Sequence, residues 1–369
     1  MKKDMQYYVK ISSKVMLENL KRRKGLTKEL VEKYILSDKK DICIVASGSS
    51  LNAAITAELF MNKYIGSKVT VLSPTEYMYY RKAMVKDNFM IVISQSGCST
   101  NVIEAVLDMK KDGIEPVALT GDLHGSLKRY VSTLIEYGVG NETVGYVTLG
   151  MTTLIEYLIL FSLEVSLNQG IVSEQQYNEI LKDIIVCCNT NGEAYQKAIG
   201  FTERYYEDLF KMDRAIIVAD GANMGIAREA SLKFGETLKI PTLYCESEEY
   251  AHGPNMQLTP EYSVFFIDTN NQTDRMYDIF KATEKVIRHA YFVTNKPVEE
   301  KYNVLQFDAS VLPELSPLFT VVLFQYICAN VTIEKNNFKC HPYFEEFDKV
   351  IKIKTDEYEE IYKAKQEKK

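Results

Sequence analysis

Short apolar runs alternate with longer helical patterns along most of this chain. The first run, Ile42–Ala46, is rich in β-branched residues and ends at the turn Ser47-Gly48-Ser49-Ser50, after which a helical pattern covers Asn52–Tyr64. Strands buried on both faces of a parallel sheet read as continuous apolar runs, because neither face meets water. We therefore predict a doubly wound α/β domain with a parallel sheet. Its further strands are expected at Val69–Leu72, Met90–Ile93, Val117–Leu119 and Leu134–Tyr137.

The same pattern starts again in the second half of the chain. The run Ala215–Ala219 leads through a turn into a helical pattern over Gly225–Leu238, and each half closes with a long apolar helix, Met151–Val165 or Pro317–Val331. The spacing is far too long for a solenoid repeat, so a duplicated domain is predicted. The later strands of the second copy are expected at Thr242–Cys245, Val264–Ile267, Ala290–Val293 and Val304–Phe307. The predicted organisation is leading helices over 1–40, a first domain over 41–170, connecting helices over 171–208, a second domain over 209–335 and a tail over 336–369.

Composition narrows the class of protein. A chain of 369 residues with a net charge of −6 is long enough for two domains and too acidic for a typical nucleic-acid binder. The longest apolar stretches, near Thr153–Val165 and Leu318–Ala329, contain Glu156, Glu164 or Gln325 and are too short to span a bilayer, so no membrane association is expected. The seven Cys form no CxxC pair and the four His have no metal-ligand spacing. We therefore expect a cytoplasmic protein with reduced thiols, no metal site and no cofactor.

A serine-rich loop follows the predicted strand Met90–Ile93. The segment Ser94-Gln95-Ser96-Gly97-Cys98-Ser99-Thr100 stands where a strand ends and a helix begins, and helix N-termini bind phosphates through unpaired N–H groups. The turn after Ala46 offers a second set of donors at the same sheet edge. Either turn alone is more simply an ordinary serine cap, but two in one α/β unit favour an anion site. Neither matches a nucleotide-binding motif, and the second copy has Asp268 at the matching place. A single phosphate site, in the first copy, is predicted.

The second copy carries a possible acid–base group. Glu229, Lys233 and Glu236 share one helix face by their spacing, although a solvated row of ion pairs is the commoner meaning of such a trio. His252 lies in a loop fixed by the following Gly-Pro, and a His there can titrate near neutral pH and open a sugar ring. Alternatively, its ring caps a backbone group in the turn.

Three of these segments together resemble a known family. Gly48-Ser49-Ser50, Ser94-Gln95-Ser96-Gly97-Cys98-Ser99 and Glu249-Tyr250-Ala251-His252-Gly253-Pro254 look like the markers of tandem sugar isomerase (SIS) domain proteins, among them the isomerase half of glutamine–fructose-6-phosphate aminotransferase. The resemblance covers about Ile42 to the C-terminus. It implies a pair of doubly wound αβα domains, usually dimerised, and a small-molecule sugar phosphate as the ligand. The phosphate-binding residues that it implies are Ser49, Ser50, Ser94, Gln95, Ser96 and Ser99, with Gly48, Glu142, Gly145 and Glu249 as further substrate-binding residues.

The resemblance also implies catalytic roles. Glu236 is the expected base that moves a proton between C1 and C2, with Lys233 beside it, and His252 is expected to open the ring from the partner subunit of a homodimer. The family's tail ends with a lysine that can form a Schiff base, for which Lys349 is the candidate here. Two features depart from the family. Val147-Thr148-Leu149 replaces its Ser-Thr-Lys stretch, and the chain has neither a glutaminase domain nor a Cys at residue 2, so glutamine-driven amination is not expected.

Four functions remain open from the sequence. The first is an aldose–ketose or amino-sugar phosphate isomerase or deaminase, and the second is a deglycase that splits a fructosamine 6-phosphate by the same enolisation. The third is a non-catalytic sugar-phosphate sensor, which no DNA-binding motif accompanies. The fourth, a purely structural dimer, would not need the serine loops. Glu236 and His252 favour an enzyme over the last two.

Overall fold

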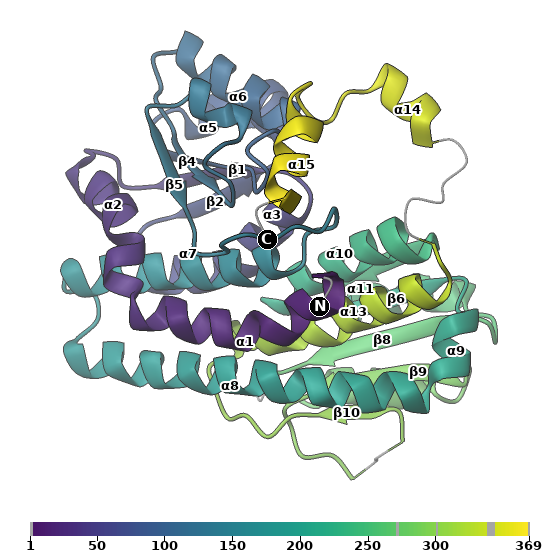
Figure 1. Ribbon diagram of the computed structural model, residues 1–369. Coiled ribbons are helices and arrows are strands. Elements are labelled where there is room, and N and C mark those ends of the chain that lie inside the picture. The colour runs from purple at the N-terminus through teal and green to yellow at the C-terminus, as the bar shows by residue number, and fades with distance from the viewer. Residues whose placement is uncertain (1–2, 271–272, 300–301, 338–343, 368–369) are drawn as a thin grey trace. The chain divides into compact units, whose positions relative to one another are not determined.

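The computed structural model describes residues 3–270, 273–299, 302–337 and 344–367. The chain divides into two compact units (Figure 1). The first unit consists of Val15–Tyr177 together with Cys340–Lys369, and the second consists of Asn178–Lys339 together with Met1–Lys14. The C-terminal tail therefore belongs to the unit that carries the serine loops.

The first unit is built around a parallel sheet that has five strands in the described residues, in the order β2-β1-β3-β4-β5. The chain leaves β1 for β2 on one side and returns to β3 on the other, so the strand order reverses between β1 and β3. Ligands of such sheets bind at the carboxyl ends of the two strands that flank this reversal. The strands are β1 (Ile42–Ala46), β2 (Val69–Leu72), β3 (Phe89–Ile93), β4 (Val117–Thr120) and β5 (Thr133–Glu136).

Helices cover this sheet because its three central strands, β1, β3 and β4, are apolar on both faces, as their complete burial shows. Alternate residues of β1, Cys43 and Val45, join a core cluster with Val102 and Val106 of the helix that follows β3. The helices of the unit are α2 (Arg23–Leu36), α3 (Ser49–Tyr64), α4 (Pro74–Glu76), the π-helical turn η1 (Tyr77–Arg81), α5 (Lys82–Val85), α6 (Thr100–Lys111), the 3-10 turn η2 (Ser126–Arg129), α7 (Leu149–Asn168), α14 (Phe344–Val350) and α15 (Tyr358–Glu367).

The second unit repeats the strand order of the first. Its sheet reads β7-β6-β8-β9-β10 from the opposite edge, again parallel and again with five strands in the described part of the chain. The predicted doubly wound α/β fold and its duplication are thereby confirmed. The strands are β6 (Ala215–Ala219), β7 (Thr242–Cys245), β8 (Ser263–Asp268), β9 (His289–Thr294) and β10 (Val304–Gln306). The helices are α9 (Tyr206–Lys211), α10 (Asn223–Lys233), the π-helical turn η3 (Phe234–Leu238), α11 (Ser247–Ala251), η4 (Pro254–Gln257), α12 (Arg275–Thr283), η5 (Pro313–Leu315) and α13 (Pro317–Glu334), while α1 (Met5–Lys21) and α8 (Glu174–Arg204) span residues of both units.

The two most apolar helices are core elements. The segments Leu149–Asn168 and Pro313–Glu334 are long and apolar enough to cross a membrane by length and composition, yet they are 94% and 89% buried inside the protein. Such burial is what the core helices of a soluble protein show. In the first unit α7 packs against α2 and α3.

Candidate active site

The loop after β3 gathers the hydroxyl groups of Ser94, Ser96 and Ser99, which we call the hydroxyl cup. The Ser94 hydroxyl donates to the Ser99 hydroxyl over 3.0 Å and accepts from the Ser99 backbone N–H over 3.4 Å. The Cys98 backbone N–H donates to the Ser96 hydroxyl over 3.2 Å. Ser99 is the N-cap residue of α6, so the cup lies at the positive end of that helix. The predicted phosphate residues of this loop are thus gathered at one helix N-terminus.

Two glycines let this loop fold so tightly. Gly97 has φ = +64°, and a Cβ there would stand 2.9 Å from the Cα of Gly125. A Cβ on Gly125 would in turn stand 2.6 Å from the Ser96 carbonyl oxygen. The backbones of the loops that follow β3 and β4 therefore lie in direct contact at these two glycines. Gly97 belongs to the serine-rich segment that the sequence singled out. The need for a glycine at 125 arises only from its contact with Ser96 and Gly97, which lie far from it in the chain.

The turn after β1 lies beside the same cup. Gly48 has φ = 58° and ψ = −136°, a conformation open essentially to glycine alone, and it starts α3 with Ser49 and Ser50 buried in the first turn. The Asn101 side chain of α6 donates to the Ser47 hydroxyl over 2.8 Å and so ties the two loops together. The two serine segments thus flank the reversal between β1 and β3.

Glu142 holds one side of the cup in place. Its buried carboxylate accepts from the N–H groups of Thr148, Leu149 and Gly150 at 2.9, 2.7 and 3.1 Å and from the Gln95 side-chain amide. Burial raises the pKa of the Glu142 carboxyl, and these donors oppose the rise. Glu142 thereby orients Gln95 and caps the start of α7. Nearby, a Cβ on Gly145 would stand 4.0 Å from the Tyr362 hydroxyl of the tail.

The tail brings to the cup a lysine other than Lys349, which the resemblance suggested as the Schiff-base lysine. Lys349 lies on α14, where its exposed ammonium pairs with Glu346 at 2.6 Å. Lys354 instead lies at the cup, with its Nζ 3.0 Å from the Ser96 hydroxyl and 3.3 Å from the Ser99 hydroxyl. Lys354 was not predicted as a site residue. The alternation Ile351-Lys352-Ile353-Lys354 was a signal for an extended segment that could have indicated it.

In the second unit, the predicted trio of charges is a buried cluster. Lys233 is 2% exposed, and its Nζ lies 2.6 Å from Glu236 Oε2 and 3.6 Å from Glu229 Oε1. Burial acts against the ammonium, but the charges of Glu236 and Glu229 outweigh it and raise the pKa of Lys233. Glu229 is also buried, while the Glu236 side chain is 33% exposed. A solvated row of ion pairs is therefore not what these residues form.

Glu236 owes its position to an irregular turn. Residues Phe234–Leu238 form a π-helical turn directly after α10, and such turns are frequent at functional sites. The turn ends at Lys239, which has φ = 61°. The Lys233 ammonium donates a hydrogen bond to Glu236 Oε2. In the described part of the chain no hydrogen bond reaches Oε1. One oxygen of this partly exposed carboxylate is thereby available as a hydrogen-bond acceptor.

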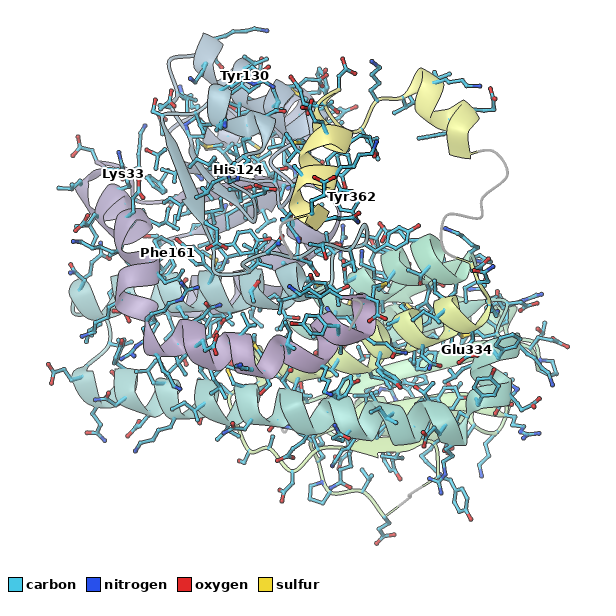
Figure 2. All side chains as sticks on the ribbon, viewed as in Figure 1. Lys33, His124, Tyr130, Phe161, Glu334 and Tyr362 are labelled. Atoms are coloured by element: carbon cyan, nitrogen blue, oxygen red, sulfur yellow. The ribbon has the colours of Figure 1, made fainter. Side chains whose placement is uncertain are left out.

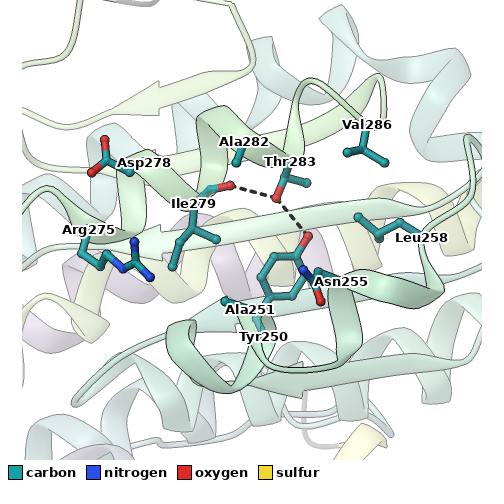
Figure 3. A pocket seen from close by; sticks show the side chains of 10 residues that line it. All are labelled: Tyr250, Ala251, Asn255, Leu258, Arg275, Asp278, Ile279, Ala282, Thr283 and Val286. Atoms are coloured by element: carbon teal, nitrogen blue, oxygen red, sulfur yellow. Dashed lines mark hydrogen bonds between the residues drawn. The ribbon is translucent and has the colours of Figure 1, made fainter.

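His252 and Glu249 lie on the surface of the second unit. The His252 backbone N–H ends α11 by donating to Glu248 and Glu249 carbonyls, while its side chain is exposed. Within the described residues, no hydrogen bond joins the His252 ring to Glu236. Tyr250, two residues earlier, points the other way into a pocket of about 320 Å³, where its hydroxyl lies 2.9 Å from that of Thr283 (Figure 3). This buried tyrosine anchors α11 and thereby presents His252 to the outside.

The second unit has an ion pair where the first has its hydroxyl cup. Asp268 at the end of β8 is 3% exposed and accepts from Lys296 over 2.9 Å. Burial raises the pKa of the Asp268 carboxyl, and Lys296 opposes the rise. A buried carboxylate at this position disfavours a bound anion.

Residues 35–163 match the SIS domain family. The chain is 26% identical over 338 residues to the isomerizing glutamine–fructose-6-phosphate aminotransferase of Caldanaerobacter subterraneus subsp. tengcongensis, with 88% of this chain and 52% of that protein covered. The chain thus spans about half the length of the curated relatives it matches. The match to the family lies on the first sheet, and both serine loops fall inside it.

Solved structures share the whole SIS-type architecture. A protein proposed to be a phosphosugar isomerase, from Clostridium difficile 630, superposes with a TM-score of 0.84 at 20% identity and covers 93% of this chain and 97% of its own. The C-terminal domain of glucosamine-fructose-6-phosphate aminotransferase from Francisella tularensis gives a TM-score of 0.70 at 22% identity, with 87% and 96% covered. At these identities the likeness shows the fold, with the SIS domain followed by a second domain of the same topology.

Proposed function

We propose that the chain is an enzyme that binds a sugar phosphate and moves a proton between its first two carbons. The expected substrate is a hexose or amino-hexose 6-phosphate, and the reaction is of the isomerase or deaminase type. Support comes from the SIS domain with its hydroxyl cup and from the carboxylate cluster of the second unit. The cup would hold the phosphate through Ser94, Ser96 and Ser99 and the N-terminus of α6.

Glu236 would act as the base. Its Oε1 takes the proton from C2 of the open-chain sugar, an enediolate forms, and the same carboxyl returns the proton to C1. Lys233, kept charged by two carboxylates, holds Oε2 over 2.6 Å and fixes the direction in which Oε1 points. A positioned base of this kind contributes about 10²–10⁴-fold to the rate. The ring must be opened first, and we assign that step to a His252 supplied by a second copy of the chain, because its side chain is exposed.

One observation carries the proposal of catalysis over simple sensing. Glu236 is the partly exposed member of an otherwise buried charge cluster. Burying Glu229 and Lys233 costs desolvation energy, and their ion pairs hold Glu236 in a fixed position. Proton abstraction needs just such a fixed and accessible carboxylate.

The cysteines support a reducing compartment, and we place the protein in the cytoplasm. Among the described residues the cysteines are free and most of them are buried. Burial raises the pKa of the Cys43 and Cys328 thiols to about 12, which keeps them in the unreactive thiol form.

A ligand screen followed by isotope exchange tests the proposed reaction. Hexose 6-phosphates, amino-hexose 6-phosphates and fructosamine 6-phosphates are compared with their unphosphorylated parents by thermal shift, since a ligand that binds the native state raises the melting temperature. The stabilising class is then incubated with the protein in D₂O, and deuterium at C1 or C2 is followed by NMR. Stabilisation by phosphorylated sugars with exchange at these carbons is expected. Release of a free amine from a fructosamine 6-phosphate would make the enzyme a deglycase, and stabilisation without exchange would make it a sensor.

A further inference from the structure

The tail of the chain is paired with the hydroxyl cup by main-chain hydrogen bonds. Ser99 and Lys354 form an antiparallel bridge. On one side of it the Thr100 N–H donates to the Ile353 carbonyl over 3.3 Å, and on the other the Thr355 N–H donates to the Cys98 carbonyl over 2.9 Å. The Thr100 hydroxyl adds a bond of 2.7 Å to the Lys352 carbonyl. The segment around Lys354 therefore has a fixed register against the cup.

Side chains beyond the bridge hold the tail on the same face. The Thr355 hydroxyl lies 2.8 Å from that of Ser126, and Glu357 accepts from Arg129 over 2.6 Å. The hydrogen bond from Arg129 lowers the pKa of the Glu357 carboxyl to about 2. Further along the tail lies Tyr362 of α15, which is labelled in Figure 2. Its hydroxyl donates to the Thr143 carbonyl over 2.9 Å. These contacts leave Lys354 facing the cup in one register only.

The register of the tail places the Lys354 ammonium beside the hydroxyl cup, whose own side-chain donors are neutral. The loop Ser94–Thr100 contains no charged side chain. The Lys354 ammonium lies within hydrogen-bond distance of Ser96 and Ser99. A phosphate monoester carries about −1.5 to −2 charges at pH 7, and hydrogen bonds between ionised partners are roughly twice as strong as neutral ones. An anion bound by the cup's hydroxyls would therefore also lie within reach of this ammonium.

We propose that Lys354 is a phosphate-binding residue that completes the cup and supplies its positive charge. This assignment rests on the proposed function, because it takes the cup to be the phosphate site. It gives the tail a role in substrate binding, and it assigns that role to a side chain in a part of the chain beyond the SIS match.

The test compares Lys354→Gln with Lys354→Arg and with Lys352→Gln in the full-length protein. Lys352 is the matched control, since its exposed side chain pairs with Asp356 at 2.7 Å, and a substitution there keeps the main-chain bonds. The probes are inorganic phosphate, fructose 6-phosphate and fructose, and the readout is the dissociation constant by calorimetry at two salt concentrations. Loss of one charge-assisted bond predicts an affinity for the two phosphate probes lower by about 10- to 100-fold in Lys354→Gln. Lys354→Arg and Lys352→Gln should stay within a few-fold of the unaltered protein.

The outcomes separate the two proposals. Equal or tighter phosphate binding by Lys354→Gln would overturn the role of Lys354, and tighter binding would show that the ammonium blocks the cup. The phosphate site itself would stand in that case. If the unaltered protein binds none of the phosphorylated probes, the proposed function fails first. Should Lys354→Gln not fold, Lys354→Ala is measured instead. It is judged by the same change in phosphate affinity.

Discussion

At the scale of single residues, Glu236 has the sharpest assignment. Replacement by Gln keeps the shape and a hydrogen-bonding oxygen for Lys233 but removes the base, so turnover should fall about 10²–10⁴-fold while the affinity for phosphorylated ligands changes little. Glu261→Gln, an exposed substitution in the same unit, is the control. Steady-state rates and thermal shifts check both. Turnover within a few-fold of the unaltered protein would remove Glu236 as the base.

Gly97 has the second residue-scale assignment, as the residue that lets two loops meet. Ala at Gly97 adds a Cβ 2.9 Å from Gly125 Cα on top of the strain of φ = +64°. Gly113→Ala is the matched control, because Gly113 has φ = +74° with nothing within 4 Å. The control should lose about 1 kcal/mol of unfolding free energy, and Gly97→Ala about 1–3 kcal/mol more. Denaturant unfolding measures both, and phosphate binding should weaken in Gly97→Ala alone. Equal losses would mean that the loops do not touch as described.

At the scale of elements, the core helix α7 has a buried carboxyl with a pH signature. Glu156 is 0% exposed, Asn19 donates to its Oε2 over 3.1 Å, and Oε1 has no hydrogen-bond partner. Burial raises the pKa of Glu156 well above its ordinary value of 4.5. The native state therefore keeps a proton that the unfolded chain releases, and stability falls as pH rises between the unfolded and the folded pKa.

Glu156→Gln should remove that loss. Relative to the unaltered protein, the variant should gain about 1.4 kcal/mol of unfolding free energy for each pH unit within this window and nothing below it. Unfolding curves from pH 4 to pH 8 provide the measurement. Glu174→Gln, at the exposed start of α8, measures the general effect of removing one negative charge. A difference between Glu156→Gln and the unaltered protein that does not grow with pH would contradict the buried-carboxyl account.

The same scale shows how far the sequence could go. Strands such as Ile42–Ala46 and Ala215–Ala219 were predicted with the bounds the structure has, since burial on both faces leaves a local apolar signature. The π-helical turn Phe234–Leu238 was not predicted, because the extra residue in such a turn has no comparable local signature. The lysine at the cup was also missed. Lys354 is placed by contacts with Ser96 and Ser99, which are more than 200 positions away in the chain and so leave no trace in local patterns.

At the scale of the whole molecule, the two sheets share one topology but differ in chemistry. The first unit has hydroxyl groups after its third strand, whereas the second has the Asp268–Lys296 pair after the corresponding strand and has its charge cluster on α10 and η3. Each copy of a duplicated fold can keep a different part of one reaction, because the fold leaves the loops free to vary. This difference was readable from the sequence, where Asp268 stands in place of the serine loop.

The last expectation concerns two copies of the chain. If His252 serves the Glu236 of a second copy, each site of a dimer takes its base from one chain and its histidine from the other. Glu236→Gln and His252→Ala should then be nearly inactive alone, yet a mixed dimer regains one intact site, with Glu236 from the His252→Ala chain and His252 from the other. The isolated mixed dimer should therefore show about half of full activity, and an unfractionated mixture from random assembly of equal amounts about a quarter. Co-expression with two affinity tags, isolation of the mixed species and a turnover assay measure this directly, with each variant mixed with itself as the control. No recovery in an isolated mixed dimer would assign His252 to the site of its own chain.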